Sequence, residues 1–196
     1  MATEWRPFTV PNLITLVRLL CIPVFVWLLF GLDDRLAASL PLGTLGATDW
    51  VDGWFARRYG QVSELGKIID PVADRLLLGT AIVSILIDGS MPLWVALLIL
   101  TREILVSIAG LVLAALGARR IDVTFAGKTA TFFNMISVPG FLAAESGVWW
   151  DGIALVVAWG CAAIGIVVGW YALFDYVPRG REALREGRAA REEPAA

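Results

Sequence analysis

Four aspartates at two fixed spacings are the residues of this sequence best suited to chemistry. Asp49 and Asp52 lie three residues apart, and Asp70 and Asp74 lie four residues apart. In a helix either spacing places both carboxylates on one face, so two such helices turned towards each other form a site lined only by oxygen ligands. Oxygen ligands suit magnesium and manganese, and a pair of these ions clamps a phosphoryl group. The aspartates therefore predict a site for two divalent ions and a phosphate.

The residues near the aspartates suit a diphosphate ligand. Gly53 and Gly66 allow a bulky ligand to approach the backbone closely, and Arg57 supplies a guanidinium group that fits a phosphate oxygen. The sequence has no histidine, so any acid–base step must use carboxylates. The alternative interpretation is that the aspartates are helix caps and ion-pair partners of buried arginines. Ionisable residues inside membrane spans are usually functional, which favours the first interpretation.

The elements that must position these residues are membrane spans. The chain is 58% hydrophobic, with a mean hydropathy of +0.74. We expect an all-α polytopic membrane protein with six transmembrane helices and a short N-terminal interfacial segment, residues 1–12. The spans are expected near residues 13–30, 36–59, 66–87, 92–116, 129–144 and 153–174, with a polar stretch, 117–128, before the fifth. The expected domains are a transmembrane domain, 1–177, and a charged cytoplasmic tail, 178–196.

The distribution of lysine and arginine predicts the orientation. The predicted loops on the side of the N-terminus carry nearly all of these residues, whereas the opposite loops hold only Arg35. Both termini and the aspartates are therefore expected in the cytoplasm. The net charge of −2 gives no basic excess of the kind that binds nucleic acid. The two cysteines lie in apolar runs and are expected to be packing residues.

Eight positions resemble the signature of the CDP-alcohol phosphotransferases (CDP-alcohol phosphatidyltransferases), D-x2-D-G-x2-A-R-x8-G-x3-D-x3-D. The matching residues are Asp49, Asp52, Gly53, Ala56, Arg57, Gly66, Asp70 and Asp74. The resemblance implies transfer of a phosphatidyl group from CDP-diacylglycerol to an alcohol, with release of CMP, dependent on magnesium or manganese. It further implies that the four aspartates hold the metals, that Asp74 accepts the hydroxyl proton, and that the enzyme is a homodimer in a bacterial cell membrane.

The same resemblance implies residues that contact the donor and the acceptor. Gly53, Arg57 and Ser63 would contact the CDP moiety, as would Asn12 and Thr15, whose alternative role is to cap the first helix. The candidates for an acceptor phosphate are Arg102, Arg119, Arg120 and Lys128. Arg119 and Arg120 are equally explained as anchors on the cytoplasmic side.

The acceptor is best predicted as glycerol 3-phosphate. The opening Pro-Asn-Leu-Ile-Thr and the stretch Thr101–Ser107 resemble bacterial phosphatidylglycerophosphate synthases. Those enzymes continue the second stretch towards a Leu-Arg, where this chain has Ile108-Ala109-Gly110. They also carry Gly-Lys-x-Lys-Thr, where this chain has Ala130 at the second lysine. Gly-Lys-x-Ala-Thr-Phe instead resembles cardiolipin synthases of the same superfamily, whose acceptor is phosphatidylglycerol. Inositol phosphate is a third possible acceptor.

Two other classes of function fit the sequence less well. A transporter would place its ionisable residues near the middle of the bilayer between repeated halves, but here both aspartate pairs lie near one face and no repeat is visible. A structural scaffold would explain the apolar spans but not the glycine, alanine and arginine positions tied to the aspartates.

Overall fold

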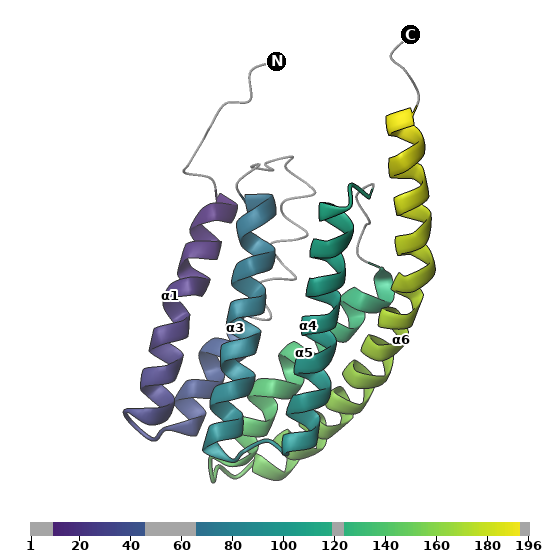
Figure 1. The fold of residues 1–196 in the computed structure, drawn as a ribbon. Helices are drawn as coiled ribbons and strands as arrows, with labels where there is room; N and C mark the ends of the chain where they lie inside the picture. Colours follow the sequence, from purple (N-terminus) through teal and green to yellow (C-terminus); the bar gives the residue numbers. More distant parts are fainter. Residues whose placement is uncertain (1–9, 46–65, 119–123, 193–196) are drawn as a thin grey trace.

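The computed structural model describes residues 10–45, 66–118 and 124–192, and all regular structure in these ranges is helical. The helices are α1 (Val10–Phe30), a helical segment at 35–45, α3 (Gly66–Asp88), α4 (Leu93–Ala115), α5 (Phe125–Ala144) and α6 (Asp151–Glu192). They run alternately down and up in one bundle (Figure 1). We call the end where α3 and α5 begin the upper end, and the opposite end the lower end. The expected all-α architecture is thus confirmed over these ranges.

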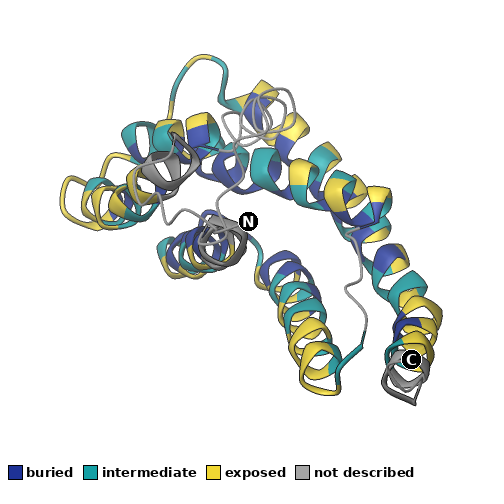
Figure 2. Ribbon diagram, turned by 90° about the horizontal axis from the view of Figure 1, so that it is seen from above, coloured by how far each residue is buried: buried dark blue, intermediate teal, exposed yellow. Residues whose placement is uncertain are grey.

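The hydrophobic core fills the lower half of the bundle. It combines Phe25 and Leu29 of α1 with Ile82 and Ile85 of α3 and with Phe141 of α5, and all five side chains are fully buried. Seen from above, the buried residues lie on the sides of the helices that face one another, and the exposed residues lie on the outer sides (Figure 2). The lower half therefore holds the helices together, while the polar starts of α3 and α5 lie above the core.

An ion pair closes the lower end. Arg35 Nε donates to Asp88 Oδ2 at 3.0 Å, and Ser90 also donates to this carboxylate. Burial acts to raise the pKa of Asp88, but these hydrogen bonds and the charge of Arg35 outweigh it and lower the pKa. The same pair raises the pKa of Arg35. The contact joins the segment at 35–45 to the end of α3.

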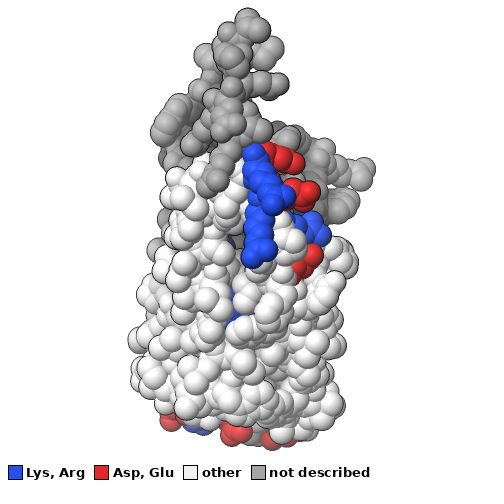
Figure 3. Space-filling view, turned by 45° about the vertical axis from the view of Figure 1, so that its right-hand side comes forward, with Lys and Arg blue, Asp and Glu red and all other residues white. Residues whose placement is uncertain are grey.

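The surface identifies a membrane protein. On the face in Figure 3, charged side chains gather near the two ends, and the surface between them is almost entirely uncharged. Two described helices, Leu93–Ala115 and Asp151–Gly187, are long and apolar enough to cross a membrane. In addition, α1 contributes a shorter apolar stretch, Leu16–Phe30. The predicted number of six spans is not confirmed, because only these two of the described helices are long and apolar enough, and the span predicted at 36–59 lies partly outside the described residues.

Three expected boundaries are wrong. Helix α1 begins at Val10, so Asn12 lies inside the helix and is not its N-cap. Helix α5 begins at Phe125, before the expected end of the polar stretch at Lys128. Helix α6 does not end at Phe174 but continues through Pro178 to Glu192. The expected domain boundary at residue 177 therefore falls within a continuous helix, and the two-domain division stays a prediction.

Candidate functional site

The upper end of the bundle gathers the described positions that the sequence connects with chemistry. Helix α3 begins at Gly66, as expected, and positions 70 and 74 follow in its first turns. On a continuous helix a spacing of four residues is about 6 Å along the axis and returns to the same face. The start of α1, which carries Asn12 and Thr15, lies at this end too (Figure 1). The backbone thus carries these positions at one end of the molecule.

Several predicted site residues lie outside the described residues. They are Asp49, Asp52, Gly53, Arg57, Ser63, Arg119 and Arg120. The predicted metal ligands at these positions therefore stay predictions, and so do the predicted contacts with the nucleotide.

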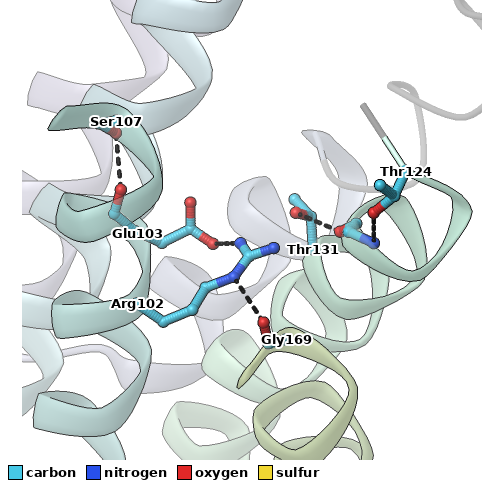
Figure 4. A network of polar contacts seen from close by, with 7 residues as sticks. Arg102, Glu103, Ser107, Thr124, Thr131 and Gly169 are labelled. Atoms are coloured by element: carbon cyan, nitrogen blue, oxygen red, sulfur yellow. Dashed lines mark hydrogen bonds and ion pairs between the residues drawn. The ribbon is translucent and has the colours of Figure 1, made fainter. Parts of the chain in front are cut away.

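Arg102 is the best-defined cation of the upper half. It lies on α4 and is only 4% exposed. Its Nη1 donates to the carboxylate of Glu103, and its Nε donates to the carbonyl oxygen of Gly169 on α6 at 3.4 Å (Figure 4). The guanidinium group therefore bridges α4 and α6.

Gly169 makes this bridge possible because it has no side chain. A Cβ atom there would lie 3.3 Å from Arg102 Nε and 3.3 Å from the Cβ of Ala130. Ala130 on α5 is fully buried. Arg102 consequently reaches into a close contact between α5 and α6, and an added Cβ at position 169 would require Arg102 or Ala130 to shift by a few tenths of an ångström.

Lys128 lies in the first turn of α5 and is exposed. The helix starts where it does because Thr124 is its N-cap, with Oγ1 accepting a hydrogen bond from the backbone nitrogen of Gly127 at 3.0 Å. The start of a helix carries partial positive charge and unpaired N–H groups, which favour an anion. Lys128 and this helix start form an arrangement suited to a phosphate.

The sequence interpretation missed a second set of close contacts below Arg102. Asn134 on α5 is 1% exposed, and its Oδ1 has no hydrogen-bond partner among the described residues. It lies against Gly165 of α6, where an added Cβ would overlap Oδ1 and lie 3.1 Å from Cγ. Gly165 and Gly169 are four residues apart, which is the small-residue spacing of closely packed membrane helices. That spacing was a visible signal for this contact.

The described part of the site can bind and orient anions. A buried guanidinium group and an exposed lysine at a helix start both favour phosphate. The described side chains contain no cluster able to hold a metal ion. A metal site would need the aspartates of the signature, whose oxygen-only chemistry fits magnesium or manganese.

Comparison with known proteins gives a consistent family. The family model described as CDP-alcohol phosphatidyltransferase matches residues 8–170. The chain is 34% identical over 190 residues to a protein of Streptomyces coelicolor named cardiolipin synthase (CMP-forming), covering 94% of this chain and 88% of the relative.

Two further relatives carry names of another activity. A Mycobacterium tuberculosis protein named probable phosphatidylglycerophosphate synthase is 35% identical over 191 residues, covering 95% of this chain and 87% of the relative. A Bacillus subtilis protein named CDP-diacylglycerol–glycerol-3-phosphate 3-phosphatidyltransferase is 34% identical over 149 residues, covering 69% of this chain and 77% of the relative.

Proposed function

Since the chain belongs to the CDP-alcohol phosphatidyltransferase family, we propose that it makes phosphatidylglycerophosphate from CDP-diacylglycerol and glycerol 3-phosphate. The acceptor hydroxyl oxygen forms a bond to the β-phosphorus of the donor. The bond from this phosphorus to the bridging oxygen breaks, and CMP leaves with the electron pair. The eight-residue signature, whose last three positions open α3, is the observation that carries this proposal.

In this proposal all four aspartates bind metal ions, and one of them also accepts a proton. Asp49, Asp52, Asp70 and Asp74 would hold two magnesium or manganese ions, which when bound neutralise the charge on the diphosphate and on the leaving CMP. The Asp74 carboxylate also accepts the proton of the attacking hydroxyl and passes it to water. A carboxylate is a weak base, but a nearby cation makes the hydroxyl more acidic, so the transfer is feasible.

The remaining proposed contacts orient the two substrates. Gly53 and Arg57 would bind the diphosphate of the donor, while Ser63, Asn12 and Thr15 would contact its nucleotide. Lys128 and Arg102 would bind the phosphate of the acceptor, with Arg119 and Arg120 nearby in sequence. Arg102 is supported by its burial and by the Glu103 carboxylate, which orients the guanidinium group until an anion arrives.

A specific observation also favours a second acceptor, phosphatidylglycerol. The phosphatidylglycerophosphate synthase pattern has a second lysine where this chain has Ala130. Ala130 packs closely against Gly169 of α6, where an added Cβ would lie 3.3 Å from the Cβ of Ala130. The relative from Streptomyces coelicolor is named a cardiolipin synthase. Fewer cations suit a phosphate that is already a diester and carries one charge. Cardiolipin synthesis is therefore the second candidate function.

We further propose that the enzyme is a homodimer of six-span chains in a bacterial cell membrane, with the upper end in the cytoplasm. The excess of lysine and arginine in the segments at that end supports this orientation. CDP-diacylglycerol would then enter from the bilayer, and the nucleotide would face the cytoplasm.

The test is release of CMP by purified full-length protein given CDP-diacylglycerol, magnesium or manganese, and one acceptor at a time. Glycerol 3-phosphate, phosphatidylglycerol and inositol phosphate are compared. We expect activity with glycerol 3-phosphate and a loss of about 10²-fold or more in Asp74→Asn. Asp151→Asn, at the opposite end of the bundle, should leave the rate unchanged. Activity with phosphatidylglycerol alone would select the second candidate, and release of CMP without metal would contradict both.

A further inference from the structure

Helix α6 continues past the ends of the other described helices (Figure 1), and we call its upper part, residues 175–192, the extension. One side of this extension packs on α4, because Gly180 and Ala183 are buried and a Cβ at Gly180 would lie 3.1 Å from Leu113 Cδ1. The extension is therefore held at a fixed place beside the bundle. Its other sides are exposed.

One exposed side of α6 is continuous from the apolar surface into the extension. Its residues follow each other at spacings of four, three, four, three and four, so they share one face of the helix. They are Val167, Tyr171, Phe174, Pro178, Arg181 and Arg185, and every one is exposed. Val167 and Phe174 are each 68% exposed. The face is apolar in its lower part and basic in its upper part, and we call it the α6 outer face.

The acidic residues of the extension lie on a different side. Asp175 and Glu182 are seven residues apart, and the hydrogen-bonded pair of Asp175 with Arg179 lies on their side of the helix. Figure 3 shows a column of basic side chains above the uncharged surface, with acidic side chains and a further basic side chain beside it. Among the described residues, Arg181 and Arg185 form no ion pair. The α6 outer face therefore presents unshared positive charge.

The position of this charge identifies its partner. Arg181 is seven residues above Phe174, which is about 10 Å along the helix. The headgroup layer of a bilayer begins where the hydrocarbon ends, and arginine side chains reach towards it. We propose that Arg181 and Arg185 bind the phosphates of anionic lipids in the leaflet at the upper end, and that this contact holds the extension of α6 against the membrane surface. The proposal does not depend on which acceptor the enzyme uses.

The experiment measures amide hydrogen exchange of residues 179–187 in the full-length protein in vesicles. Phosphatidylcholine alone is compared with phosphatidylcholine mixed with phosphatidylserine, because phosphatidylserine is neither of the proposed acceptor lipids. We expect exchange to slow by about five-fold or more with phosphatidylserine, and this effect to disappear at high salt. Equal exchange in the two kinds of vesicle would overturn the proposal, whatever the enzyme activity.

Matched variants isolate the α6 outer face. Arg181→Gln with Arg185→Gln should abolish the effect of phosphatidylserine, whereas Arg181→Lys with Arg185→Lys should retain it. Glu182→Gln, on the acidic side, should also retain it. If the double Gln variant still responds, or if inorganic phosphate slows exchange equally in phosphatidylcholine vesicles, the surface does not act by binding lipid headgroups.

Discussion

At the scale of single residues, the site depends on small side chains as much as on charged ones. Arg102 lies buried where Gly169 leaves space between α4, α5 and α6, since a Cβ at position 169 would lie 3.3 Å from its Nε. Glycine in a helix costs about 1 kcal/mol relative to alanine. The loss is tolerated here because a close approach of helices and a buried guanidinium group depend on it.

Gly169→Ala should therefore lower stability and weaken binding of the acceptor. The new Cβ would press on Ala130 and on Arg102 Nε, at a cost of about 1–3 kcal/mol. We expect a lower thermal midpoint and a higher KM for the acceptor, with little change in KM for CDP-diacylglycerol. Gly160→Ala is the control, because no atom lies within 4 Å of its added Cβ. If both alanine variants behave alike, Gly169 does not position Arg102.

At the scale of elements, the contact between α5 and α6 is held by pairs of complementary shape. Gly140 of α5 faces Ala158 of α6, where an added Cβ would lie 3.1 Å from the Cβ of Ala158. One turn and more above, the amide of Asn134 occupies the space that Gly165 leaves. Membrane helices cannot rely on the hydrophobic effect to associate, so such close packing supplies the attraction between them.

Gly165→Ala should be strongly destabilising, because its methyl group would overlap Asn134 Oδ1. We expect a loss of about 1–3 kcal/mol. Asn134→Ala alone should be close to neutral, since it removes a buried oxygen that has no partner among the described residues. The double variant should recover most of the stability lost by Gly165→Ala, which thermal unfolding in detergent can measure. Simple addition of the two effects would show that the residues are not coupled.

The sequence predicted the elements better than their ends. Apolar runs located α1, α3 and α4 closely, because the length of a span follows from the thickness of the bilayer. The predicted end of α6 was wrong because Pro178 and the charges after it are typical of a helix end. In the structure, the contact of Gly180 with Leu113 supports the helix beyond that point.

The site was predictable only where residue type determines chemistry. The aspartate signature is visible in the sequence because its spacings are local. The bridge from Arg102 to Gly169 spans 67 residues, and no local pattern connects two such distant positions.

At the scale of the whole molecule, the charges divide the surface into two polar ends and an uncharged middle (Figure 3). In a bilayer the middle faces lipid and the ends face water on opposite sides. Glu145 follows the end of α5 at the lower end, and Glu186 lies on the extension of α6 at the upper end. Both are exposed. Helix α6 is the only helix between these glutamates, so an α6 that spans the bilayer would place them on opposite sides of the membrane.

Labelling of single cysteines tests this arrangement and its orientation together. Glu145→Cys and Glu186→Cys are placed in a chain whose own cysteines, Cys21 and Cys161, are replaced by alanine. We expect an impermeant maleimide to label Glu145→Cys in intact spheroplasts and Glu186→Cys only in inside-out vesicles. The reason is that arginine-rich ends of membrane proteins are generally retained in the cytoplasm. Labelling of both from one side would contradict a spanning α6. The reversed result would keep the span but place the aspartates outside the cell, where neither CDP-diacylglycerol nor glycerol 3-phosphate would be supplied from the cytoplasm.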